Sequence, residues 1–177
     1  MRRISHIARA TLPLAGMIAL AAVVATAAAP ALHAQSTVAV GDSAPDAELT
    51  RPDGTPVSLS QYIGKTPVLI EFWATWCPNC RALEPTMHRV AAKYAGRVKF
   101  LGVAVSVNES RERAKLYAEK HKLPVEVLWD GDGNASGAYD VPATSYIVII
   151  DKNGKIVYTG VGADQDLDAA VSKALAG

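Results

Sequence analysis

Cysteine is scarce in this sequence, because only two of its 177 residues are cysteine and both fall in one short stretch, as Cys77 and Cys80. At most one disulfide can therefore form within the chain, which excludes the dense disulfide framework of small secreted domains. Scarcity also argues against a zinc site, which needs three or four ligands. Beyond the two thiols, the chain after residue 34 offers only His88 and His121, neither at ligand spacing.

An excess of positive charge is also missing. The chain has 18 basic and 17 acidic residues, with no run of lysine or arginine, so nothing in it predicts a nucleic-acid partner. Internal repeats and low-complexity tracts are absent after Gln35. Half of the residues are hydrophobic, which at this length is enough for one globular domain with a full core and too little for two.

The first 34 residues read as an export segment. A basic start precedes a long apolar stretch and a run of small residues that ends at Ala34. This order predicts a signal peptide over residues 1–34, a new N-terminus at Gln35 and one folded domain over 35–177. Removing the segment leaves 15 basic and 17 acidic residues. A periplasmic or other extracytoplasmic location follows, where a cysteine pair can be oxidised.

An uncleaved membrane anchor is the alternative for this segment. Ala10 to Leu32 is 23 residues without a charge, which is long enough to span a bilayer. Ten of these residues are alanine, which contributes little to insertion, and Pro30 interrupts the far end. Composition therefore favours cleavage over anchoring.

Apolar runs and amphipathic stretches alternate along the rest of the chain and predict an α/β domain with a mixed sheet. We expect two short extended pieces around the Pro52-Asp53-Gly54 turn, and buried strands at "PVLIEFW", "VKFLGVAV" and "VEVLW". A hairpin should form around "DKNG". Helices are expected from Pro78 to Gly96, after an Asn108 cap, and over 165–175. The "DGDGN" stretch at 130–134 fails as a calcium loop and reads as a plain turn.

The cysteine pair stands at the junction of a buried strand and a helix. Free backbone N–H groups and the helix dipole at that point favour ionisation of Cys77, which predicts an exposed attacking thiolate. Cys80, about one turn further on, should be the more buried, resolving thiol. Such an unequal pair is what thiol-disulfide exchange requires. A purely structural disulfide is the alternative, but a disulfide that closes so short a loop would stabilise the fold little.

The segment "VLIEFWATWCPNCRALEP" resembles the active site of thioredoxin-fold proteins. The stretches "GDSAPDAELTRPDGTPVSLSQYIGK" before it and "YDVPATSYIVIIDKNGKIV" after it narrow the resemblance to the exported TlpA/ResA-like thioredoxins. This resemblance covers essentially Val40 to Leu175. It implies a mixed central sheet flanked by helices, with an N-terminal hairpin and a central helix-strand insertion. It also implies that the redox-active Cys77-Cys80 disulfide works without a cofactor or metal.

The same resemblance implies roles for other residues. Pro142 matches the proline that is cis in this fold and faces the cysteines, and Val141 would present its backbone to a bound peptide. Glu71 matches the acid that accepts the proton of the resolving Cys80 through water. Burial in an apolar strand should raise the pKa of such a carboxyl group. The plainer reading of Glu71 is a partner for a lysine at the sheet edge.

Residues around the motif would dock the partner and tune the potential. Trp76 should belong to the docking surface, and Pro78 should contact the substrate. Many TlpA-like proteins carry proline just before the second cysteine, where this chain has Asn79. Several also carry glutamate three residues after it, where this chain has Leu83. The direction of electron transfer is therefore left open.

The function that the resemblance implies is reduction of disulfides in specific partner proteins, such as apocytochrome c or a copper-site protein. Electrons would come from a membrane donor of the DsbD/CcdA type, and the protein would act as a monomer. Oxidation of substrate thiols is the first alternative. A thiol peroxidase is a second, although Ala74 stands where that chemistry uses threonine. A third is a Cu(I)-binding protein in which Met87 or His88 joins the thiolates.

Overall fold

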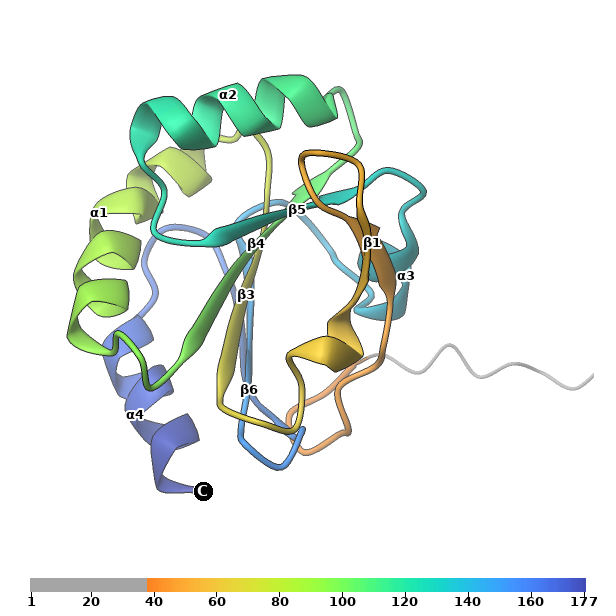
Figure 1. Cartoon of the computed structure of the whole chain (residues 1–177). Coiled ribbons are helices and arrows are strands. Elements are labelled where there is room, and N and C mark those ends of the chain that lie inside the picture. The colour runs from red at the N-terminus through yellow and green to blue at the C-terminus, as the bar shows by residue number, and fades with distance from the viewer. Residues whose placement is uncertain (1–37) are drawn as a thin grey trace, which may run out of the picture. The chain divides into compact units, whose positions relative to one another are not determined.

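The six residues Val68–Trp73 are all buried and form β3, an interior strand of the sheet between β4 and β6 (Figure 1). The structure is a computed structural model that describes residues 38–177. Within that range the sheet has seven strands in the order β2-β1-β5-β4-β3-β6-β7. Their bounds are β1 Glu48–Thr50, β2 Pro56–Ser58, β3 Val68–Trp73, β4 Lys99–Val105, β5 Glu126–Asp130, β6 Tyr146–Ile150 and β7 Ile156–Val161.

The sheet is mixed, as the sequence predicts. Strands β3, β4 and β5 run parallel, whereas β6 pairs antiparallel with β3, β7 with β6, and β1 with both β5 and β2. Side chains alternate between the two faces along a strand. Val68, Ile70 and Phe72 therefore enter one apolar cluster, and Leu69 enters another. Glu71 shares the face of Leu69, so its carboxyl group lies on the helix-covered side.

Helices α1 (Pro78–Lys93), α2 (Arg111–His121) and α4 (Leu167–Ala176) cover that face. The short helix α3 (Asn134–Ala138) packs against β1 and β5 on the other side, together with the single 3-10 turn Leu59–Gln61. In Figure 1, α1, α2 and α4 lie along one side of the sheet and α3 beside β1. This arrangement confirms the thioredoxin-like α/β fold and its N-terminal hairpin β1-β2. It also confirms the helix-strand unit α2-β5, which lies between β4 and β6 along the chain.

One local prediction was wrong. The cap of α2 is Ser110, whose hydroxyl accepts a hydrogen bond from the Arg113 N–H, because Asn108 adopts a left-handed turn conformation two residues earlier. The expected turn after β5 is present at residues 131–133, and α3 follows it directly. The buried Asp130 carboxylate accepts hydrogen bonds from the Ala135 and Ser136 N–H groups and holds this short helix in place.

The expected export segment, residues 1–34, lies outside the described residues. Within residues 38–177, no helix combines the length and the apolar character needed to cross a bilayer.

Candidate active site

The two cysteines are joined by a disulfide at the start of α1. Pro78 occupies the first helical turn, where a missing N–H costs nothing, and Cys77 is the N-cap. The Cys77 Sγ accepts a hydrogen bond from the Cys80 N–H at 3.0 Å. A sulfur held in this way lies where the helix N-terminus stabilises negative charge. The predicted strand-to-helix junction and the predicted bond partner are both present.

The expected difference in exposure between the two sulfurs is not present. Cys77 is 1% exposed and Cys80 is 5% exposed, so both are buried and Cys77 is slightly the more so. The cap geometry explains this result, because a sulfur that accepts from the Cys80 N–H points into the helix start rather than away from it. Accessibility therefore does not distinguish the two cysteines in the disulfide form, whereas the backbone hydrogen bond to the Cys77 sulfur does.

Glu71 is buried beside Cys80, as the sequence suggested. Its residue exposure is 8%, and its Oε1 has no hydrogen-bond partner. Burial first, and the charge of Glu84 second, raise the pKa of Glu71 to about 8. Glu71 and Cys80 line one small cavity. The centre of a water molecule can occupy a volume of about 10 Å³ within it. That volume holds roughly one water, which is the connection that proton transfer between the two groups needs.

Gly102 keeps space for this cavity. It pairs with Glu71 across the β3-β4 ladder, and a β-carbon placed there would lie 2.8 Å from Val125 and 3.0 Å from the Trp73 indole nitrogen. Val125 and Trp73 both form part of the cavity wall. A glycine in the middle of a strand often marks such a close approach.

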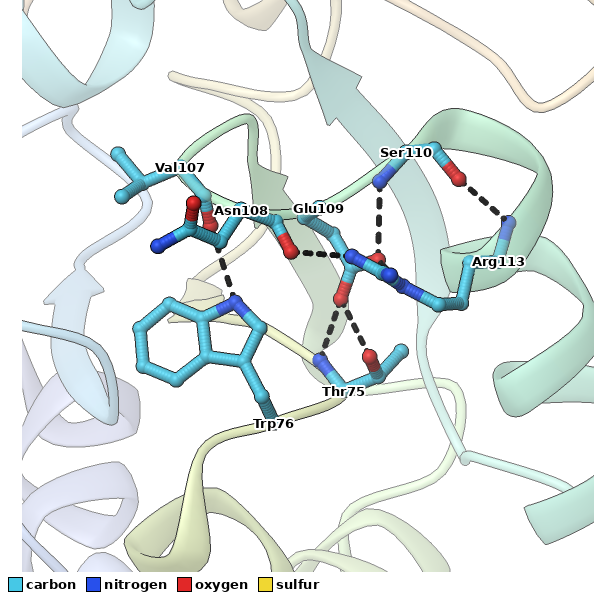
Figure 2. A network of polar contacts seen from close by, with 7 residues as sticks. All are labelled: Thr75, Trp76, Val107, Asn108, Glu109, Ser110 and Arg113. Atoms are coloured by element: carbon cyan, nitrogen blue, oxygen red, sulfur yellow. Dashed lines mark hydrogen bonds and ion pairs between the residues drawn. The ribbon is translucent and has the colours of Figure 1, made fainter.

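The connection before Cys77 is fastened to the loop that follows β4 (Figure 2). The N–H and hydroxyl of Thr75 donate to Glu109 Oε2 at 2.7 and 2.6 Å, and the Ser110 N–H and Arg113 Nε donate to Oε1. Burial of Glu109 acts to raise its pKa, but these hydrogen bonds outweigh it and hold the pKa below its usual value. Sequence reasoning missed Glu109, because its partner lies 34 positions away.

Trp76 projects from the same connection. Its indole N–H donates to the Val107 carbonyl at 2.9 Å, while 43% of the residue stays exposed (Figure 2). Beside it lies a hollow of about 260 Å³, lined by Trp76, Val105, Val107, Ser136, Val141, Pro142, Ala143 and Thr144. The structure thus brings the predicted docking residues Trp76, Val141 and Pro142 around one mostly apolar hollow, while Pro78 is exposed at the start of α1.

The expectation of a cis bond before Pro142 was wrong, since residues 38–177 contain no cis peptide bond. Pro142 is exposed in the hollow rather than packed at the start of β6. The chain enters β6 through Ser145 instead, which is fully buried, has φ +63° and donates its N–H to the Phe72 carbonyl at 2.8 Å. The left-handed conformation of Ser145 makes the turn into β6.

A second carboxyl group borders the cavity. Glu84 lines it from α1, and the Tyr117 hydroxyl donates to Glu84 Oε1 at 2.6 Å. Near Oε2, at 3.2 Å, lies His121 Nδ1. Only the i, i+4 relation of Tyr117 and His121 on α2 could have suggested that these two residues act together.

No group of three or more histidine, cysteine, aspartate or glutamate side chains is arranged to hold a metal ion within the part of the chain that the structure describes. The chemistry visible in that part is the disulfide and the buried carboxyl group beside it.

Comparison with known proteins agrees with this geometry. The profile of the Redoxin family matches residues 39–176. The chain belongs to the Redoxin family. It is 34% identical to the thiol-disulfide oxidoreductase ResA of Geobacillus kaustophilus over 137 residues, which is 76% of this chain and 77% of that protein. Such similarity makes this redoxin a TlpA/ResA-like thiol-disulfide oxidoreductase.

Solved structures give the same result. A thiol:disulfide interchange protein of the thioredoxin family from Chlorobium tepidum superimposes with a TM-score of 0.65 at 27% identity, covering 77% of this redoxin and 98% of that chain. A secreted disulfide oxidoreductase from Mycobacterium tuberculosis, described as homologous to E. coli DsbE, gives 0.61 at 27% identity, covering 73% and 93%.

Proposed function

We propose that this chain is an exported protein-disulfide reductase in which Cys77 attacks and Cys80 resolves. The observation that carries the proposal is the pair of unequal surroundings. The Cys77 sulfur accepts a backbone hydrogen bond at a helix N-terminus, and Cys80 shares a one-water cavity with the buried Glu71. The first environment stabilises a thiolate, and the second supplies a group that can take up a proton.

The Cys77 thiolate attacks a partner disulfide, forming a mixed disulfide and releasing one partner sulfur as a thiolate. Cys80 then gives its proton through the cavity to Glu71 and attacks the Cys77 sulfur. The bond between Cys77 and the partner breaks, and the second partner sulfur leaves with the electron pair. The partner is reduced by two electrons and the Cys77-Cys80 pair is oxidised.

Partner recognition belongs to the hollow beside Trp76. An exposed tryptophan next to the reacting sulfur, with Val107 63% exposed across from it, offers apolar surface for an extended peptide. We propose that Val141 and Pro142 complete this surface. Proteins with thiol-disulfide chemistry, such as apocytochrome c or a copper-site protein, are the proposed partners, with a DsbD/CcdA-type membrane protein as the electron donor to a monomer.

The proposed location is extracytoplasmic. It is supported by the composition of residues 1–34 and by the similarity to a protein from Mycobacterium tuberculosis that is described as secreted. Expression of the full chain, followed by fractionation and determination of the N-terminus, tests the location. A protein found in the periplasm that begins at Gln35 supports both export and cleavage. A full-length protein in the cytoplasm contradicts the proposal.

Dithiol oxidation is the second candidate function, and a specific contact favours it. Because the Cys80 N–H stabilises a Cys77 thiolate, it favours the reduced protein and makes the disulfide more oxidising. Equilibration with glutathione buffers separates the two functions. A potential near the thioredoxin value of about −270 mV supports the reductase, whereas one near about −120 mV supports the oxidase.

Trapping tests the assignment of the two cysteines. The Cys80→Ser variant keeps the attacking sulfur and loses the resolving one, so mixed disulfides with partner proteins should accumulate in the source cell and identify them. Cys77→Ser is the matched control and should trap far less. Equal or greater trapping by Cys77→Ser would reverse the assignment.

A further inference from the structure

The cavity beside Cys80 has a second carboxylate in its wall. Glu84 lies on α1 four residues after Cys80, one helical turn on, and faces the same small volume as Glu71. Both of its oxygens have partners on α2. The Tyr117 hydroxyl donates to Oε1 at 2.6 Å, and His121 Nδ1 lies 3.2 Å from Oε2.

The α2 side of this cluster is held in place by packing. The rings of Tyr117 and His121 stack with centroids 3.8 Å apart and an interplanar angle of 12°. The other neighbour of the Tyr117 ring is Trp73, at 5.7 Å between centroids, and Trp73 is itself part of the cavity wall. One contiguous set of side chains therefore leads from the cavity to the outer surface of α2.

Exposure increases along this set. Glu71 is almost wholly buried, the Glu84 side chain is 21% exposed, and the His121 side chain is 32% exposed. We propose that Glu84, held by Tyr117 and His121, is a positioning residue that controls the protonation of Glu71 and links the cavity to solvent. The proposal rests on the proposed function, in which Glu71 exchanges a proton with Cys80.

The charge of Glu84 determines in which direction it shifts the protonation equilibrium of Glu71. Two carboxylates that face one cavity repel, so the negative charge of Glu84 favours the protonated form of Glu71. The other titratable groups that face this cluster are Tyr117 and His121 on α2 and, in the reduced protein, Cys80 on α1, and Arg81 acts on Tyr117 from α1.

One substitution should therefore move the titration of Glu71. Glu84→Gln removes the negative charge while its amide oxygen can still accept from Tyr117, so Glu71 should ionise at lower pH. His121→Gln keeps a hydrogen-bond donor for Glu84 and should leave the titration of Glu71 near that of the wild type. His88→Gln is the matched control, because His88 is an exposed histidine on α1 that does not line this cavity.

The direct test is the NMR titration of the Glu71 carboxyl carbon in oxidised protein labelled with ¹³C-glutamate, assigned with Glu71→Gln. The wild type should titrate near pH 8. Glu84→Gln should lower this midpoint by about half to one pH unit, whereas His121→Gln and His88→Gln should leave it near the wild-type value. An unchanged or raised midpoint in Glu84→Gln would overturn the proposal.

Kinetics separates this inference from the function on which it rests. Reduced protein is mixed with dithiodipyridine, and the second release of thiopyridone reports the attack of Cys80 on the mixed disulfide at Cys77. At neutral pH, Glu84→Gln should accelerate this second phase about threefold to tenfold, as its lowered midpoint implies. Absence of a second phase in the wild type would overturn the proposed function and the inference together. A second phase with equal rates in wild type and Glu84→Gln would overturn the inference alone.

Discussion

Glu71 occupies a strand position where every neighbour along β3 is apolar, and none of the described side chains gives its Oε1 a hydrogen bond. A carboxyl group in such a place remains protonated to unusually high pH, because burial penalises its charged form. With a pKa of about 8, Glu71 can act as base or acid near physiological pH. The buried carboxyl group therefore lowers the stability of the fold when it is ionised, but its pKa suits proton transfer.

The cost of Glu71 should be measurable as a pH dependence of stability. Between the unfolded pKa of 4.5 and the folded pKa of about 8, the native protein holds a proton that the unfolded chain releases. The free energy of unfolding therefore falls as pH rises through this window. Glu71→Gln should remove that fall and stabilise the protein by a few kcal/mol, as an order of magnitude, at about pH 9.

Urea unfolding at about pH 5 and about pH 9 measures this difference. Glu119→Gln, a change at an exposed position on α2, is the control and should leave the pH dependence as in the wild type. The Glu71→Gln variant should also resolve mixed disulfides more slowly than the wild type. If the Glu71→Gln variant is no more stable than the wild type at the higher pH, then ionisation of buried Glu71 does not destabilise the fold as proposed.

At the scale of elements, the loop between β4 and α2 is joined to the connection between β3 and α1 by one carboxylate. Glu109 has no exposed side-chain surface and accepts from Thr75 on one side and from Ser110 and Arg113 on the other (Figure 2). These contacts fix the two loops that carry Trp76 and Val107. The docking surface therefore depends on a residue that does not itself belong to it.

Replacing Glu109 should loosen this connection. Glu109→Gln loses the charge-assisted hydrogen bonds and should destabilise the protein by about 1–3 kcal/mol. The lowered pKa of Glu109 stabilises the fold above its unfolded pKa, and this stability is lost as pH falls through the folded pKa. The variant should therefore lose less stability than the wild type on acidification. Chemical denaturation at neutral and acidic pH tests this, with exposed Glu112→Gln as the control, and equal acid sensitivity of Glu109→Gln and wild type would contradict it.

The β3-β4 pair also requires a residue without a side chain at position 102. A methyl group on Gly102 would meet Val125 and Trp73 at 2.8 and 3.0 Å, so one of them must move into the cavity or the strand must shift. Gly102→Ala should lower stability by about 1–3 kcal/mol and slow the Cys80 step.

Gly137→Ala provides the matched control for that substitution. A β-carbon at Gly137 would have nothing within 4 Å, and alanine is favoured over glycine inside a helix. Thermal unfolding should therefore show a lower Tm for Gly102→Ala and an equal or higher Tm for Gly137→Ala. A Gly102→Ala protein with wild-type stability would mean that this strand pair is not tightly packed.

For the whole molecule, local sequence signals were enough to predict the elements that form the sheet and its main helices. The run "PVLIEFW" became β3 because a continuous apolar stretch can only be buried on both faces, and Pro78 marked the start of α1. The final helix and the "DKNG" hairpin likewise follow from cap and turn residues near them in the chain.

Features that depend on distant contacts escaped sequence reasoning. The pairing of Glu109 with Thr75, and of Glu84 with Tyr117 and His121, joins segments more than 30 positions apart. The burial of Cys77 was missed because the cap conformation turns its sulfur toward the helix. The trans bond at Pro142 was missed because the expectation of a cis bond came from the resemblance, and local sequence does not fix the isomer of an X–Pro bond.

In the reduced protein, the Cys77 thiol should ionise at lower pH than the Cys80 thiol, although both cysteines are buried. The most direct measurement is the rate of iodoacetamide alkylation of each cysteine in the reduced protein across pH, with the sites distinguished by peptide mass spectrometry. Cys77 should react well below the ordinary thiol pKa of about 8.5, and Cys80 should react only at higher pH. Equal rates for the two cysteines at every pH, or faster alkylation of Cys80, would contradict the account.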